Sequence, residues 1–239
     1  MAAIGDRARI AALVVAFTLV CGAAWGAGPG SDLRPEFRRA SCGAVFPIDA
    51  LTSPTGAHRE GHPSARALRE VIRDPRGIEP IPKRRWRLLQ RRDGRALYGS
   101  GDKRRVVAVL LERTRAQSWS YSSSGDCRPE VVRDGLGPSG WELNPEGSPP
   151  EATDTSIELL VTEQACASGE PSQDRILEPT VRYGRKAITI TYFVEPLKGG
   201  QFCPSNPPSE VTLALAESLG DRALLDGATV VPRQRFPDR

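Results

Sequence analysis

Histidine and aromatic residues are scarce in this sequence. The 239 residues include two histidines, His58 and His62, and 6% aromatic side chains. Two histidines leave little material for a histidine-based metal site or for the base that activates a serine nucleophile. The sequence also lacks a glycine-rich phosphate loop, a dinucleotide-binding fingerprint and a G-x-S-x-G motif. It therefore predicts no cofactor and offers no catalytic residue set.

The histidine spacing is the one feature that points toward a metal. Two ligands four positions apart share one face of a helix. However, Gly61 and Pro63 flank His62 and disfavour a helix over both histidines. We therefore expect no metal site there, and we interpret Ser122, Ser123 and Ser124 as a polar turn without a catalytic base.

Long apolar runs are absent beyond residue 26. The run Ile10–Val20 follows two arginines and precedes a small-x-small site at residues 24–26, which predicts a signal peptide over residues 1–26. No later run approaches the ~18 residues that cross a bilayer, so we expect a secreted chain without a transmembrane segment. A lipid anchor on Cys21 is the alternative. The branched Val20 disfavours it, because the processing enzyme expects a small residue before the cysteine.

Cysteine pairs are too far apart for common metal motifs. Cys42, Cys127, Cys166 and Cys203 remain after cleavage, and the nearest two are 37 positions apart. Export to an oxidising compartment favours two disulfides over a metal site. Spacing alone leaves three pairings open. We expect Cys166–Cys203, because both residues flank the apolar strand 187–194, and hence Cys42–Cys127.

The chain alternates between irregular and periodic segments. Residues 27–58 are interpreted as a flexible leader and residues 141–151 as a connector rich in proline and glycine. Between them, residues 59–140 contain one helix with Ser64 as N-cap, ended by Asp74-Pro75, and four strand-like runs. The runs are Trp86–Gln90, Ala96–Tyr98, Val106–Leu111 and Trp119–Tyr121.

Residues 152–239 show only β signals. Apolar residues alternate with polar ones around Ile157–Val161, Ile188–Val194 and Val211–Leu215. The predicted fold class is α+β, mostly β: a short helix on a small antiparallel sheet, followed by a β-sandwich-like unit. We expect Trp86, Trp119 and Trp141 to pack in cores rather than to form a ligand platform.

Several short motifs resemble a pattern in uncharacterised exported proteins and lipoproteins of actinobacteria. They include Gly125-Asp126-Cys127, Leu160–Glu163, Ala165–Gly169, Cys203-Pro204 and Leu219–Arg222. The resemblance covers about half the chain and implies a secreted, cysteine-bridged β domain. It implies no activity.

Positive charge is concentrated in the first half. Residues 59–115 have 17 Lys and Arg against 7 Asp and Glu, whereas residues 116–239 have 11 against 18. One hypothesis is that cations on one face of a hairpin bind an anionic envelope polymer or an acidic lipid surface; nucleic acid is not the partner we expect. The alternatives are a solvated face, or pairing with the acidic second half. The candidate residues are Arg84, Arg85, Arg87, Arg91, Arg92, Arg95, Lys103, Arg104 and Arg105.

The sequence thus favours a secreted, disulfide-braced, non-catalytic binding or structural module, and it leaves the oligomeric state open. The alternative is a carboxylate-based hydrolase of cell-wall glycans, because two acids can cleave a glycosidic bond without histidine or metal. Glu163, Asp221 and Asp226 are the candidate acids. Each also has a structural interpretation, such as the turn signal Asp226-Gly227.

Overall fold

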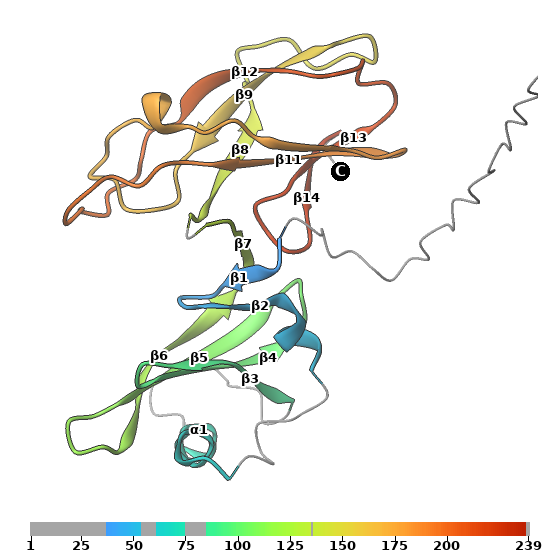
Figure 1. Ribbon diagram of the computed structural model, residues 1–239. Coiled ribbons are helices and arrows are strands. Elements are labelled where there is room, and N and C mark those ends of the chain that lie inside the picture. The colour runs from blue at the N-terminus through green and yellow to red at the C-terminus, as the bar shows by residue number, and fades with distance from the viewer. Residues whose placement is uncertain (1–36, 54–60, 75–84, 135, 238–239) are drawn as a thin grey trace, which may run out of the picture. The chain divides into compact units, whose positions relative to one another are not determined.

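The computed structural model describes residues 37–53, 61–74, 85–134 and 136–237, which all belong to one unit, Leu33–Arg239. The predicted signal peptide and Cys21 lie outside the described residues. Strands dominate and form sheets of three, four and seven members (Figure 1), which confirms the α+β, mostly β class. Among the described residues, no helix is long and apolar enough to span a bilayer.

The four-stranded sheet follows chain order. Its antiparallel strands are β3 (Trp86–Arg92), β4 (Arg95–Gly101), β5 (Val106–Arg113) and β6 (Trp119–Cys127). A tight turn joins β3 to β4, with positive φ at Asp93 and Gly94. The apolar run of β5 serves both faces of the sheet, because successive side chains point to opposite sides.

Helix α1 (Pro63–Arg73) covers one face of this sheet. Ala65 and Leu68 pack against Tyr98, Val109 and Leu111 in one buried cluster. The expected N-cap was wrong by two residues.

The N-cap is His62, whose Nδ1 accepts a hydrogen bond from the Ser64 backbone N–H. Pro63 occupies the first helical position, where its fixed φ suits a helix. Ser64 is buried inside the helix, and its hydroxyl lies 2.8 Å from the Tyr98 hydroxyl.

A small sheet packs on the opposite face. It comprises β1 (Arg39–Ser41), β2 (Val45–Pro47) and β7 (Glu130–Val132) in the order β2-β1-β7, with the 3-10 helix η1 (Ile48–Thr52) after β2. Phe37, Phe46 and Leu51 are buried against Leu97 and Leu110 of the larger sheet. The predicted flexible leader was therefore wrong over residues 37–53, because these apolar side chains complete a core.

The third sheet has seven strands. They are β8 (Pro138–Leu143), β9 (Ser156–Thr162), β10 (Thr180–Tyr183), β11 (Ala187–Phe193), β12 (Ser209–Ala214), β13 (Ala223–Asp226) and β14 (Arg233–Phe236). The order is β12-β9-β8-β11-β13-β14, with β10 also on β11, and only β11 and β13 are parallel. The predicted alternation is confirmed, with Ile157, Leu159 and Val161 buried and their neighbours on β9 more exposed.

Trp141 joins the two parts of this sheet. Strand β8 bonds to β11 through only two residue pairs, and the Trp141 Nε1 donates to the Ile190 carbonyl across the core at 3.0 Å. Residues Trp141–Leu143 belong to β8, so the predicted connector was wrong at its start. The cause is burial, because Trp141 is 1% exposed and needs a partner for its indole N–H.

Candidate functional site

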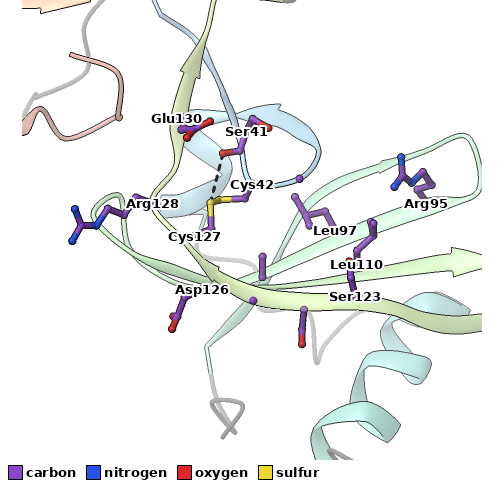
Figure 2. Close-up of a pocket in the computed structure, with 14 residues that line it drawn as sticks. Ser41, Cys42, Arg95, Leu97, Leu110, Ser123, Asp126, Cys127, Arg128 and Glu130 are labelled. Atoms are coloured by element: carbon purple, nitrogen blue, oxygen red, sulfur yellow. Dashed lines mark hydrogen bonds between the residues drawn. A yellow bond between two sulfur atoms is a disulfide. The ribbon is translucent and has the colours of Figure 1, made fainter. Parts of the chain in front are cut away.

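The described residues line a groove of about 550 Å³ beside β6 (Figure 2). Leu97 and Leu110 form an apolar floor, and the Cys42–Cys127 disulfide closes one side. Small residues create the hollow. Gly125 lies opposite Ala108 on β5, and a Cβ added to Gly125 would meet no atom within 4 Å.

The groove does not assemble a catalytic pair of acids. Glu130 and Asp126 both line it, but Arg105 holds the Asp126 carboxylate through two hydrogen bonds of 3.1 and 2.6 Å. The hydrogen bond from Arg105 lowers the pKa of Asp126. Asp126 also lies opposite Val107, whose side chain packs toward α1 on the other side of the sheet. Asp126 is therefore paired with Arg105 and does not form a carboxylate pair with Glu130.

Glu130 is a half-buried carboxylate, and burial raises its pKa. Within the described part of the chain its carboxylate has no hydrogen bond or ion pair. It lines the groove and also a second hollow of about 290 Å³. Glu130 was not among the candidate residues predicted from the sequence. The only sequence feature that could have pointed to it is its position three residues after Cys127.

Replacing Glu130 with glutamine is expected to raise the free energy of unfolding at neutral pH. The folded state raises the pKa of Glu130, so the ionised carboxylate opposes folding above that pKa. The penalty disappears as the pH falls below it, so the variant and the wild type should converge in acid. Urea unfolding at several pH values measures this difference.

Glu142→Gln serves as the matched control, because Glu142 is an exposed glutamate on β8. Its stability should follow the wild type at every pH. A Glu130→Gln profile parallel to that of the control would show that the Glu130 carboxylate is not penalised by burial.

The nine predicted anion-binding residues do not share one face of a hairpin. Arg84 lies outside the described residues. Arg91 points toward α1, where its guanidinium bonds to the hydroxyls of Ser64 and Tyr98. Arg87 bonds instead to the Ser53 and Gly101 carbonyls. The expectation of one face was therefore wrong, because a bulge between Leu88 and Gln90 interrupts the alternation of β3.

Carboxylates already hold three more of these residues. Arg92 pairs with Asp93, Arg95 with Glu112 and Arg105 with Asp126, at 2.9, 3.0 and 2.6 Å. These pairs are exposed. They neutralise part of the positive charge, but only Arg105–Asp126 is a pairing with the acidic second half, since Asp93 and Glu112 belong to the basic half itself.

Five of the nine cations gather around the β4–β5 turn. Ser100 lies opposite Trp86, and Gly101 lies opposite Val106, so the start of β3 and the turn lie at the same end of the sheet. The turn is held by Asp102, whose Oδ1 accepts the backbone N–H groups of Arg104 and Arg105. We name this group the turn cluster: Arg85, Arg87, Lys103, Arg104 and Arg105.

Four members of the turn cluster have no carboxylate partner among the described residues, and three of these four make no side-chain bond at all. In the described part of the chain, no hydrogen bond or ion pair engages the side chains of Arg85, Lys103 or Arg104. Arg85 also has a φ of 63°, a backbone conformation that a residue with a side chain seldom adopts. These cations face solvent, where an anionic partner has access to them.

The three acids of the hydrolase alternative lie in different surroundings. The Glu163 carboxylate is 3% exposed and accepts both Nη groups of Arg175, at 3.1 and 2.6 Å. Asp226 is 2% exposed and pairs with Arg235. Asp221 is exposed beside a separate hollow of about 760 Å³. No arrangement of described residues favours the hydrolase alternative, which stays a prediction.

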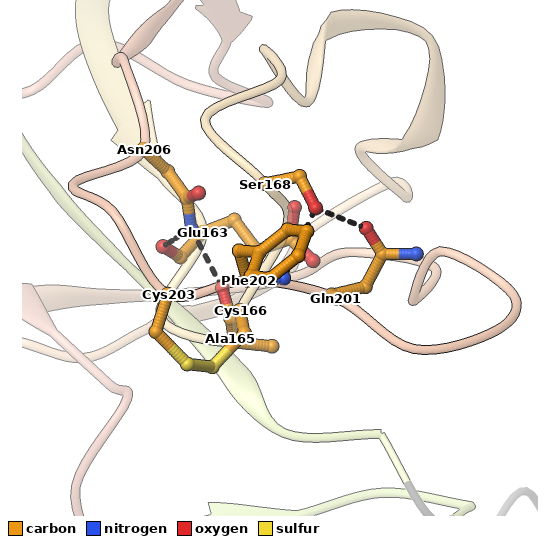
Figure 3. Close-up of a disulfide and its surroundings, with 8 residues drawn as sticks. All are labelled: Glu163, Ala165, Cys166, Ser168, Gln201, Phe202, Cys203 and Asn206. Atoms are coloured by element: carbon orange, nitrogen blue, oxygen red, sulfur yellow. Dashed lines mark hydrogen bonds between the residues drawn. A yellow bond between two sulfur atoms is a disulfide. The ribbon is translucent and has the colours of Figure 1, made fainter.

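The second disulfide stabilises a loop (Figure 3). Cys166 and Cys203 are bonded as expected, as are Cys42 and Cys127. The Cys166–Cys203 bond joins the segments that leave β9 and enter β12, which are antiparallel neighbours and so meet at one end. Ser168 exchanges hydrogen bonds with Phe202, and Asn206 donates to the Glu163 and Ala165 carbonyls. The loop presents Phe202 with 81% of its surface exposed.

The tryptophans pack as expected. Trp86 and Trp141 are buried, and Trp119 packs against the α1 cluster beside the His62 ring. His58 lies outside the described residues. Among the residues that the structure places, no group of three or more His, Cys, Asp or Glu side chains is arranged to hold a metal ion.

The site and fold thus define a disulfide-braced, mostly β module with a cationic turn and a groove. No family model, no curated protein and no solved structure matches the chain. The resemblance to exported actinobacterial proteins stays a prediction.

Proposed function

We propose that this protein is a non-catalytic binding module that works outside the cytoplasm and contacts an anionic envelope polymer through the turn cluster. The observation that carries the proposal is the grouping of five cations at one end of the four-stranded sheet, three of which make no side-chain hydrogen bond or ion pair to a described residue. Cations that remain solvated keep their charge available to a polyanion. The two disulfides support an extracytoplasmic location, because such bonds persist in oxidising compartments.

The rigid setting of the turn cluster supports the same conclusion. Hydrogen bonds from Arg87 to Ser53 and Gly101 fix the sheet end, and Asp102 fixes the turn. A polymer that binds there meets a turn whose backbone is already held in place, so the ordering cost on binding is confined to the cationic side chains. An acidic lipid surface presents similar chemistry and is tested separately below.

The test compares two triple variants with the same change in charge. Arg85→Gln, Lys103→Gln and Arg104→Gln remove the free cations of the turn cluster. Arg92→Gln, Arg113→Gln and Arg115→Gln remove three exposed cations from the opposite end of the same sheet. Binding of fluorescent heparin oligosaccharides, used as a model polyanion, is measured by anisotropy at about 50 and 200 mM salt.

Wild-type affinity should fall steeply with salt, because binding a polyanion releases counterions. The turn-cluster variant should bind about tenfold more weakly and show a shallower salt dependence, whereas the opposite-end variant should lose less than about threefold. Equal losses in both variants would show that only net charge matters. Affinity indifferent to salt would overturn the proposal. If the wild-type protein binds heparin but does not co-sediment with phosphatidylglycerol vesicles, the turn cluster binds polymers rather than lipid surfaces.

A further inference from the structure

Three arginines from distant parts of the chain come together where β7 begins. Arg128 precedes β7, and Arg233 and Arg235 lie on β14. Backbone hydrogen bonds join the start of β7 to residues 228 and 230, which lie just before β14. Val230 N donates to the Pro129 carbonyl at 2.8 Å, and Val131 N donates to the Ala228 carbonyl at 2.9 Å.

One carboxylate serves this group in the described part of the chain. Asp226 lies opposite Arg233 in the β13–β14 pair, and its Oδ2 accepts a hydrogen bond from Arg235 at 2.8 Å. Its Oδ1 is already occupied by the Ala228 backbone N–H at 2.9 Å. Asp226 therefore balances one guanidinium charge, and two positive charges remain.

The hydrogen-bond donors of the three arginines are also largely unused. Each arginine guanidinium carries five N–H donors. Arg235 uses one of them on Asp226, and its Nε is buried without an acceptor. No described residue accepts a hydrogen bond from the Arg128 or Arg233 side chain. Figure 2 shows Arg128 pointing away from the groove floor formed by Leu97 and Leu110.

The arginines repel one another. Burial lowers the pKa of Arg233, the charge of Arg235 lowers it further, and Arg128 adds to this effect against the opposing influence of Asp226. Glu130 is the other carboxylate nearby, but it lines the groove and makes no bond to a guanidinium among the described residues. The fold thus holds like charges together without the partner that would offset their repulsion.

We propose that Arg128, Arg233 and Arg235 form a binding site for a phosphate-class oxyanion. A tetrahedral oxyanion supplies the negative charge and the several acceptor oxygens that this group lacks. Planar guanidinium groups bind such oxygens in pairs, with short charge-assisted hydrogen bonds. The turn cluster differs in this respect, because its free cations lie around a solvated turn and suit an extended polyanion rather than one small anion.

This site does not rest on the proposed function. Inorganic phosphate is titrated into the full chain by calorimetry, in a non-phosphate buffer, with chloride added to keep the ionic strength constant. Arg233→Gln and Arg128→Gln are the main variants, because both residues are exposed and neither side chain makes a hydrogen bond or ion pair to a described residue. Each should weaken phosphate binding about tenfold, the loss expected for one charge-assisted hydrogen bond.

Arg235→Lys provides a second variant that keeps the charge beside buried Asp226 while removing the planar fork. It should fold and bind phosphate more weakly than the wild type. The matched control is Arg115→Gln, which removes one exposed cation from the turn between β5 and β6 of the four-stranded sheet. Its phosphate affinity should equal that of the wild type.

Two results would overturn the proposal. One is a phosphate response no larger than that to chloride at equal ionic strength. The other is equal binding by Arg233→Gln, Arg128→Gln and the control. The turn-cluster triple variant separates the two proposals: loss of heparin binding with normal phosphate binding supports both sites. If the wild-type protein binds phosphate but not heparin, the arginine site is supported and only the proposed polymer binding is contradicted.

Discussion

Replacing Cys42 and Cys127 together with alanine is expected to lower the free energy of unfolding by about 4 to 5 kcal/mol. The bond joins residues 85 positions apart, and on the chain-entropy model a long closed loop restricts the unfolded chain strongly. It also ties the end of β1 to the end of β6, which keeps the small sheet on its core. Replacing Cys166 and Cys203, which are 37 positions apart, should cost somewhat less, about 4 kcal/mol.

Urea unfolding of the two double variants and the wild type, each without reductant, measures these losses. Adding reductant to the wild type should destabilise it by at least as much as either double variant. Under the same reductant, each double variant should lose further stability through its remaining bond. A loss below about 1 kcal/mol in both variants would contradict the view that these bonds brace the fold.

The long strands were predictable because their local pattern and their environment agree. On β9, apolar side chains alternate with polar ones, and the alternate residues are those that the structure buries. On β11 the alternation holds only as far as Ile190, because Thr191, Tyr192 and Phe193 are all buried. The continuous apolar run of β5 was also informative, because both faces of its sheet are covered, by α1 on one side and by the small sheet on the other.

The short strands were not predictable, because distant partners determine them. Strands β1 and β2 have three residues each, too few for a period to appear. Their pairing depends on β7, which lies far along the chain, and on the buried side chains of Phe37 and Phe46. The same holds for β13, which has four residues and pairs in parallel with β11 across a long crossover connection rather than a hairpin turn.

The candidate sites could not be predicted from composition, because they depend on side-chain directions and on contacts between distant segments. The abundance of arginine was visible, but the bulge in β3 separates Arg87 from Arg91 and sends them to opposite faces. The approach of Arg128 to the β14 arginines depends on two backbone hydrogen bonds, which join residues 129 and 131 to the segment just before β14. In contrast, the structural interpretation of Asp226 was accessible from the sequence, because Asp-Gly is a turn signal and the Asp226 carboxylate bonds to Ala228 N just beyond it.

Replacing Arg175 with methionine is expected to lower the free energy of unfolding by about 3 to 5 kcal/mol. The Glu163 carboxylate is 3% exposed and depends on Arg175 for two hydrogen bonds. Without the guanidinium, a buried negative charge loses its partner and both of the hydrogen bonds that partner donates. Arg175 also donates to the Glu195 carbonyl, so the change affects the segment that follows β11.

The double variant Glu163→Gln with Arg175→Met identifies the cause of that loss. Because it removes the buried charge together with its partner, it should be more stable than Arg175→Met alone. Arg92→Met is the control for an exposed pair. Arg92 and Asp93 are 72% and 78% exposed, so their separation should cost less than about 1 kcal/mol. Urea unfolding provides all four values. If Arg175→Met lowers the free energy of unfolding no more than Arg92→Met does, the Glu163–Arg175 pair does not stabilise the fold. The structural explanation for the burial of Glu163 would then fail, and its catalytic role in the hydrolase alternative would have to be tested directly.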